Sequence, residues 1–268
     1  MVKALSGGTG LVAACAAVLA GCGEPGMAPT AEEALADSLT AEWLDAAGGL
    51  GAWHDISSAR YTIMTVWFDS TGAVRRMRPR RVEYRKMDGV EQTRIERPEA
   101  EGLYVQVFTG SEMWATLNDS LLAPGIRAWD ESEYVGRDVV YWFGLPYKLM
   151  DPGVNRVASP DPEGGFEMRV TFGDGVGQQP GDQWFYLFRD EDPYPEEVHY
   201  ISEGGENRSR TWWTGYGSIG RFRYVLTRTW RNADGSLNRE LRVDDVELNP
   251  DLPDSLFVRP GSGGSPTG

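Results

Sequence analysis

Residues 135–154 read VGRDVVYWFGLPYKLMDPGV, an aromatic cluster that runs into a Gly-Leu-Pro step and then into a turn. Apolar residues recur at helical spacing over 131–143, which predicts a helix in this range. Leu145 precedes a proline, and a residue in that position disfavours helical backbone, so the helix should end before it. The Asp-Pro-Gly sequence at 151–153 is typical of a turn. The segment therefore predicts a mid-chain helix that carries aromatic side chains.

On both sides of this helix the pattern changes to the two-residue period of β-strands. We expect about ten or eleven strands in meander order, at 61–68, 74–87, 90–96, 103–108, 113–117, 166–172, 182–188, 196–201, 209–214, 221–230 and 239–248. A large antiparallel sheet curls, and helices cover its concave face. The predicted fold is mainly β, in the α+β class. Its strongly curved antiparallel sheet forms a half-barrel with an N-terminal helix and a mid-chain helical lid.

Two irregularities are predicted within these strands. Pro79 interrupts the long polar run 74–87 and indicates a sheet edge or a bulge, because proline cannot donate to a strand ladder. In 241–248 the apolar residues shift phase by one position, which predicts a bulge near Asp244 and Asp245.

A helix is predicted to begin at Thr30. Thr30 and Glu33 have capping-box spacing, and apolar residues follow at helical intervals as far as Leu44. Gly48 and Gly49 then end the helix, as glycine commonly does at a helix C-terminus.

Residues 1–21 have the features of a lipoprotein signal peptide. Lys3 supplies a positive start, and 11–20 is an apolar run too short to span a bilayer. The run ends in Leu-Ala-Gly before Cys22, which closely resembles the lipobox of bacterial lipoproteins. The resemblance implies cleavage before Cys22 and lipidation of this residue, with 22–29 as a short tether. An ordinary secretory signal with a chance cysteine is the alternative.

Gly23 stands where an aspartate favours inner-membrane retention in enteric lipoproteins. By that family rule, we expect a lipid-anchored protein of the outer membrane that faces the periplasm. Processing would remove Cys15 and lipidation would use Cys22, so no thiol would remain for a disulfide.

The composition disfavours several classes of function. The 40 Asp and Glu residues outnumber the 26 Lys and Arg residues, which gives a formal net charge of −14. A general nucleic-acid role is disfavoured, since phosphate binding needs a basic surface. Two histidines, two cysteines and no CxxC or HExxH motif make a zinc site improbable. We expect no cofactor.

The sequence GYGSIG at 215–220 fits the G-x-G-x-x-G pattern, but a dinucleotide site needs a helix directly after it. An alternating strand, 221–230, follows instead. We therefore expect a glycine loop between strands and no nucleotide binding.

No catalytic set is apparent. The chain has no G-x-S-x-G motif, and a triad would have to use His54 or His199. Alternation in the strand 196–201 predicts a solvated His199. Paired carboxylates could act in a glycosidase, but no pair stands out among so many acids. The sequence therefore predicts a protein that is not an enzyme.

The run RRMRPRR at 75–81 is strongly positive, in contrast to the negative net charge of the whole chain. It could meet anionic lipid headgroups, phosphate or glycan, since arginine makes bidentate contacts with such anions. The alternative is simply a polar strand face.

The order of elements resembles the LolA/LolB-like superfamily of outer-membrane lipoprotein-sorting proteins over about residues 30–258. The segments that carry the resemblance are GGLGAW at 48–53, the opening stretch 135–154, and the C-terminal 243–260. The stretch 135–154 is similar to a block of an uncharacterised Bacteroidota-type lipoprotein family. The resemblance implies one half-barrel domain, taken here as 30–260, before a disordered tail at 261–268.

In such a fold the aromatic lid would cover a cavity that binds a lipid, an acylated molecule or another hydrophobic ligand. The residues expected to touch this ligand are Trp142, Phe143 and Leu145 in the lid and Trp184, Tyr186, Phe222 and Tyr224 in strands. The members of each strand pair lie two apart and so share one sheet face. In the alternative, the aromatics fill the barrel and the protein docks other envelope proteins through its surface.

Overall fold

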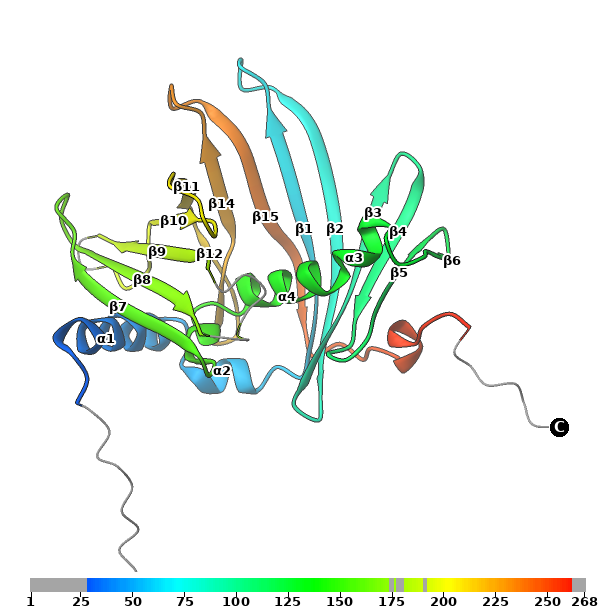
Figure 1. Ribbon diagram of the computed structural model, residues 1–268, viewed down its shortest axis with the longest axis horizontal. Helices are drawn as coiled ribbons and strands as arrows, with labels where there is room; N and C mark the ends of the chain where they lie inside the picture. The colour runs from blue at the N-terminus through cyan, green and yellow to red at the C-terminus, as the bar shows by residue number, and fades with distance from the viewer. Residues whose placement is uncertain (1–27, 174–175, 177–180, 190–191, 262–268) are drawn as a thin grey trace, which may run out of the picture.

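The computed structural model describes residues 28–173, 176, 181–189 and 192–261. All of the described strands except β12 and β13 belong to one antiparallel sheet, in the order β6-β5-β4-β3-β2-β1-β15-β14-β11-β10-β9-β8-β7 (Figure 1). β12 and β13 form a separate hairpin. The main sheet is not closed, because β6 and β7 stand at its two ends. The predicted fold class is confirmed: the protein is mainly strand, with a large open antiparallel sheet and few helices.

The strands of the first half are β1 Ser58–Phe68, β2 Val74–Met87, β3 Val90–Glu99, β4 Gly102–Phe108, β5 Met113–Leu117 and β6 Ser120–Leu121. The strands of the second half are β7 Val154–Pro160, β8 Phe166–Phe172, β9 Gln183–Phe188, β10 Glu197–Ile201, β11 Ser209–Trp213, β12 Tyr216–Ile219, β13 Phe222–Val225, β14 Thr227–Arg231 and β15 Leu237–Leu248. Each half is a meander, and the pairing of β1 with β15 joins them at the middle of the sheet.

The opening stretch of sequence makes this topology possible. Helix α3 (Arg127–Asp130), helix α4 (Ser132–Phe143) and the 3-10 helix η1 (Tyr147–Met150) connect β6 at one end of the sheet to β7 at the other. Figure 1 shows α4 running across the strands at the middle of the sheet. After β7, the strands β8, β9, β10, β11, β14 and β15 are added one beside another toward the middle of the sheet, where β15 pairs with β1.

Helix α4 lies very close to the sheet. A Cβ atom added to Gly136 would stand 2.4 Å from Oγ1 of Thr93 and 3.0 Å from Cβ of Phe108. The hydroxyl of Tyr61, on β1, donates a 3.0 Å hydrogen bond to the carbonyl oxygen of Val139. Glycine and this buried bond therefore fix the helix against the strands.

The N-terminal helix α1 (Ala31–Ala46) begins as predicted, since Thr30 and Glu33 form the reciprocal capping box. Helix α1 packs on β7, and the short helix α2 (Leu50–His54) follows. The two are joined at Gly48, where φ is +103° and a Cβ atom would meet the carbonyl oxygen of Arg221 at 2.1 Å. A second 3-10 helix, η2 (Asp254–Phe257), lies near the end of the described chain.

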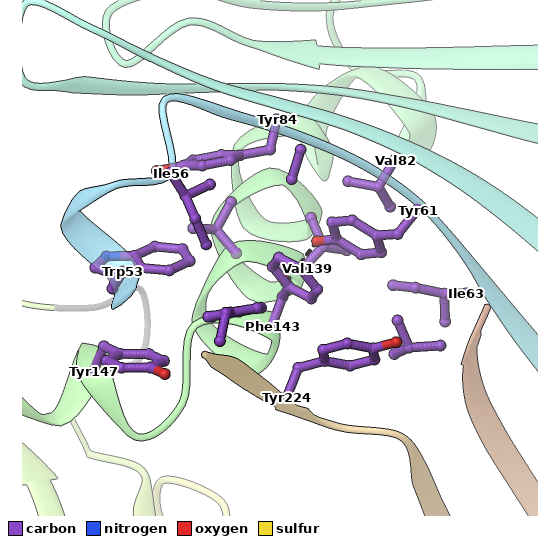
Figure 2. Packing of buried hydrophobic residues seen from close by; sticks show 14 of the residues in the cluster. Trp53, Ile56, Tyr61, Ile63, Val82, Tyr84, Val139, Phe143, Tyr147 and Tyr224 are labelled. Carbon is purple, nitrogen blue, oxygen red and sulfur yellow. Dashed lines mark hydrogen bonds between the residues drawn. The ribbon is translucent and has the colours of Figure 1, made fainter. Parts of the chain in front are cut away.

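Two large aromatic clusters fill one part of the concave side. In the first, Tyr61 stacks on Phe143 with ring centroids 4.2 Å apart, and Tyr224 packs beside them (Figure 2). In the second, Trp43 of α1 packs against Tyr186 and other aromatics. A third, smaller cluster lies under α3 and η2.

Both predicted irregularities are present. Pro79 pairs with β1, but the ladder from β2 to β3 begins only at Arg81, so Pro79 stands on a local edge. Between β1 and β15 the register shifts from Arg60–Glu247 to Thr62–Asp244, and Asp245 takes a φ of +54°. The bulge near Asp244 and Asp245 is therefore confirmed.

Several local expectations were wrong. The predicted glycine loop at 215–220 contains strand β12, which forms the hairpin with β13. The single strand expected at 221–230 is divided at Leu226 into β13 and β14, because β13 leaves the main sheet to pair with β12. The strands β6 and β7 were not predicted.

Candidate functional site

One stripe of helix α4 faces an open cavity on the concave side of the sheet. Tyr134, Asp138 and Trp142 follow one another at four-residue spacing, which places them on one side of the helix. All three line a cavity of about 570 Å³ whose other walls are strands. Val139 and Phe143 lie in the packed cluster of Figure 2 instead. The helix thus divides a filled part of the concave side from an open part.

Tryptophan and arginine dominate the cavity wall. The tryptophans are Trp67, Trp142, Trp184, Trp213 and Trp230, and the arginines are Arg78, Arg80, Arg97, Arg228 and Arg239. Asp138 is the one carboxylate that the described residues contribute to this wall. A chain with a formal net charge of −14 thus gathers cations inside its sheet. This space is called the arginine–tryptophan cavity below.

The indoles meet where the helix approaches the strands. The rings of Trp142 and Trp184 are edge-to-face, with centroids 4.7 Å apart. The ring centroids of Trp184 and Tyr200 are 4.3 Å apart, and those of Trp142 and Trp213 are 6.1 Å apart. Trp142 and Trp184 are only half-buried, so part of each ring faces the cavity.

Two of the five arginines are paired with a carboxylate at the edge of the cavity. Arg78 lies 3.0 Å and Arg97 lies 3.2 Å from Oε1 of Glu99. Each of these two guanidinium groups therefore has an ion-pair partner within the protein, although they share the one carboxylate with Arg76.

The other three arginines have no such partner. No hydrogen bond or ion pair joins the guanidinium groups of Arg80, Arg228 and Arg239 to any residue that the structure describes. Arg228 and Arg239 instead make cation–π contacts, at 4.6 Å from a Trp142 ring centroid and 3.8 Å from a Trp230 ring centroid.

Burial and mutual charge perturb the ionisable groups of the wall. Burial raises the pKa of Asp138, although the nearby positive charges of Arg228 and Arg80 act in the opposite direction. The Asp138 carboxylate also accepts a 2.7 Å hydrogen bond from Nε1 of Trp142. Burial lowers the pKa of Arg228 to about 10, so this residue is still charged at neutral pH.

The cavity continues around the end of α4. A smaller space of about 180 Å³ shares Tyr134, Asp138, Trp142 and Trp184 with the arginine–tryptophan cavity. It reaches Lys148, whose ammonium lies 2.6 Å from Asp151 and 3.1 Å from Glu91. This side space is therefore another hollow beside the aromatic lid.

The predicted ligand-contact residues divide into two groups. Trp142 and Trp184 are brought together on the cavity wall. The other five are buried in the two aromatic clusters, where they pack against neighbouring side chains: Phe143, Leu145, Tyr186, Phe222 and Tyr224. Two of the seven residues thus lie beside an open space, and five lie where the concave side is filled.

Sequence reasoning overlooked Arg228 and Arg239 as cavity residues. One signal was available in each strand: Arg228 and Trp230 lie two apart and so share a face, as do Arg239 and Leu241. Within the basic run 75–81, alternation separates Arg78 and Arg80, which line the cavity, from Met77, Pro79 and Arg81 on the opposite face.

His199 is buried, with 7% of its surface exposed, so the expectation of a solvated histidine was wrong. The flanking strands β9 and β11 cover it, and its Nε2 lies 3.0 Å from Glu197 and 3.2 Å from Nε of Arg210. In the described residues, no cluster of His, Cys, Asp and Glu could hold a metal ion. No helix in the described part of the chain is long and apolar enough to cross a membrane.

An N-terminal helix, an open curved sheet and a helix across its concave side define a LolA-like half-barrel. No protein-family model and no curated protein matches the chain. Solved structures with this fold include a DUF1329 family protein from Desulfovibrio piger, at 12% identity and a TM-score of 0.54, covering 83% of this chain and 97% of that one.

Two further neighbours have the same architecture. A LolA superfamily protein from Nitrosomonas europaea aligns at 12% identity and a TM-score of 0.52, and covers 84% of this chain and 97% of its own. A domain from Vibrio parahaemolyticus described as an outer membrane lipoprotein-sorting protein aligns at 10% identity and a TM-score of 0.50, with the same two coverages, 84% and 97%. At such identities the likeness concerns the fold.

Proposed function

We propose that this protein is a non-enzymatic, lipid-anchored protein of the bacterial outer membrane that binds a lipid or another hydrophobic ligand in its half-barrel. The observation that carries the proposal is the arginine–tryptophan cavity of about 570 Å³, which lies against the aromatic lid. Binding pockets for small molecules commonly have volumes of about 300–1,000 Å³ and aromatic walls.

The physical basis is the apolar surface of the indoles. Burying apolar surface stabilises a complex by roughly 25 cal/mol per Å², and a tryptophan ring offers a large, rigid area. Trp142 and Trp184 meet at an edge-to-face contact and leave ring surface toward the cavity. An acyl chain in this space would cover that surface and displace water from it.

The wall offers little for catalysis. Among its described residues it has one carboxylate, Asp138, which is held by Trp142, and it has no histidine or cysteine. The wall's aliphatic hydroxyl groups belong to Thr65, Ser209 and Thr211, and none of them makes a hydrogen bond to a base among the described residues. This composition supports binding over hydrolysis.

The alternative function, docking of envelope proteins by a filled barrel, draws support from the two packed clusters on the concave side. It predicts that the same packing continues throughout. The open cavity beside Trp142 is the feature that favours the binding proposal.

Uptake of a fluorescent fatty acid by purified Cys22→Ser protein tests the binding proposal. This variant prevents an attached acyl chain from competing for the cavity. Saturable uptake is expected, with an affinity at least tenfold weaker in Trp184→Ala. Trp212→Ala is the matched control, because Trp212 is also half-buried but does not line the cavity. No saturable uptake, or equal loss in both variants, would contradict the proposal.

The anchor is proposed on the lipobox alone, since Cys22 and most of the tether 22–29 lie outside the described residues. Metabolic labelling with an alkyne-modified palmitate tests it. The parent protein should carry the label, Cys22→Ser should lose it, and Cys15→Ser should keep it. Labelling that survives in Cys22→Ser would contradict the proposal that Cys22 carries the lipid.

A further inference from the structure

Three arginines of the arginine–tryptophan cavity carry positive charge that the described protein offsets only in part, through the Asp138 carboxylate near Arg80 and Arg228. Arg80, Arg228 and Arg239 all line the cavity. None of them makes a hydrogen bond, or an ion pair within 4.0 Å, with a described residue. The other two arginines of this wall, Arg78 and Arg97, each make an ion pair with Glu99.

Arg228 is the strongest of the three observations. Only 8% of its surface is exposed, so its charge is nearly withdrawn from water. Burying an unpaired charge is costly, and the N–H donors of a guanidinium need acceptors. The cation–π contact with Trp142 stabilises the guanidinium but provides no lone pair for those donors. The N–H donors of Arg228 therefore have no acceptor among the described residues.

The three guanidinium groups approach one another from different strands. Arg80 is on β2, and Arg228 is three strands away, on β14. This is roughly 14 Å across a flat sheet, at about 4.8 Å per strand. The concave curvature brings the side chains closer, so that repulsion from Arg80 is felt at both Arg228 and Arg239.

Like charges gathered in this way repel one another, and a bound anion would relieve the repulsion. The three arginines contribute three positive charges and Asp138 contributes one negative charge, a local sum of +2. A phosphate monoester carries a charge of about −1.5 to −2 near neutral pH and three acceptor oxygens. Arginine binds such oxygens through paired N–H donors, so phosphate fits this site in charge and in geometry.

We propose that Arg80, Arg228 and Arg239 form the headgroup site for an anionic amphiphile with a phosphate monoester, whose apolar chain lies along Trp142 and Trp184. This inference rests on the proposed binding function and specifies its ligand class. The arrangement follows from proximity, because Arg228 touches Trp142 and Trp142 touches Trp184.

Calorimetric titration of the Cys22→Ser protein with three probes tests the proposal: decyl phosphate, decyl glucoside and inorganic phosphate. Decyl phosphate should bind at least tenfold more tightly than either of the others. Its advantage over the neutral decyl glucoside should shrink as salt is added, since salt screens the charge. If inorganic phosphate binds as tightly as decyl phosphate, the anion does not belong to an amphiphile and the proposal is overturned.

Arg228→Met and Arg239→Met should each lower decyl phosphate affinity about tenfold and lower decyl glucoside affinity by a much smaller factor. Methionine keeps an apolar stem beside the indole. Arg239 is the safer of the two positions for folding, because it is less buried than Arg228. Arg75→Met is the matched control, since Arg75 is an exposed residue of the same strand as Arg80 and does not line the cavity.

The outcomes separate the two proposals. Equal affinity for decyl phosphate and decyl glucoside, unaffected by the arginine substitutions, would overturn the headgroup site and leave hydrophobic binding intact. Binding of neither amphiphile would overturn both proposals.

Discussion

The guanidinium of Arg228 lies 4.6 Å from the centroid of a Trp142 ring, so strand β14 and helix α4 meet through a cation–π contact on the cavity wall. The same indole donates a hydrogen bond to Asp138 and packs against Trp184. One side chain of the lid thus contacts a cation, a carboxylate and an aromatic ring. This contact is where the filled and the open parts of the half-barrel adjoin.

Replacing Trp142 by alanine should reduce ligand uptake more than it reduces stability. Trp43 is fully buried in the second aromatic cluster, and Trp43→Ala should cost about 3–5 kcal/mol of unfolding free energy. Trp142 is half-buried with one side toward the cavity, so Trp142→Ala should cost less. Urea unfolding and fluorescent fatty acid uptake, measured on both variants, check this. A Trp142→Ala cost as large as that of Trp43→Ala would mean that the lid is ordinary core.

Gly136→Ala should push α4 away from the sheet. The added methyl group would stand 2.4 Å from Oγ1 of Thr93, which real side chains do not tolerate without movement. Overpacking of this kind typically costs about 1–3 kcal/mol. Urea unfolding provides the stability measurement.

Gly164→Ala is a contrasting position, because nothing lies near the added atom there and the strain comes from a φ of +102° alone. A second substitution distinguishes a side-chain clash from backbone strain. Thr93→Ala removes the atom that the new methyl group meets, so it should recover stability when it is added to Gly136→Ala. It should recover none in Gly164→Ala protein.

Asp138→Asn should stabilise the fold at neutral pH. Burial raises the pKa of Asp138 above its ordinary value of 3.8, so the folded protein holds this proton more tightly than the unfolded chain. Ionisation at neutral pH therefore costs stability, and the cost disappears at low pH, where both states are protonated. The gain from asparagine should be present at pH 7 and lost below about pH 4.

Urea unfolding of Asp138→Asn at pH 7 and pH 3.5 measures this pH dependence. The exposed Glu112 provides a control as Glu112→Gln. A gain that is equal at both pH values would show that the effect does not come from the carboxylate charge.

The bulge of β15 should depend on a residue that tolerates left-handed backbone. Asp245 has a φ of +54°, which costs most residues about 1–2 kcal/mol and costs glycine nothing. Asp245→Gly should be near neutral, and Asp245→Val should be less stable by about that amount. Thermal unfolding of both variants decides the question, and equal stability would mean that the bulge relaxes.

Much of this architecture follows from local sequence patterns. The capping box at Thr30 and the phase slip at Asp245 are decided by neighbouring residues, and both are present in the structure. The aromatic lid was predictable as a helix because its apolar residues recur at helical spacing. The pairing of β1 with β15 is a contact between distant segments that local pattern does not encode.

The residues of the cavity wall were harder to predict from the sequence than the fold, for a related physical reason. Which face of a strand is concave depends on the curvature of the whole sheet, and alternation gives only the two faces. Phe222 and Tyr224 had the right period for a cavity wall, but their strand β13 leaves the main sheet to pair with β12, and both residues lie in the packed cluster. Arg228 and Arg239 lie in separate strands, and only the adjacency of β14 and β15 brings them to one cavity.

The location of a bound acyl chain tests the central claim most directly. Purified Cys22→Ser protein would be irradiated with a diazirine-bearing fatty acid, and the cross-linked residues would be mapped by mass spectrometry. The account predicts saturable labelling, suppressed by excess decyl phosphate, on Trp142, Trp184 and Tyr200 of the cavity wall. Cross-links confined to the exposed outer surface, or labelling that does not saturate, would contradict it.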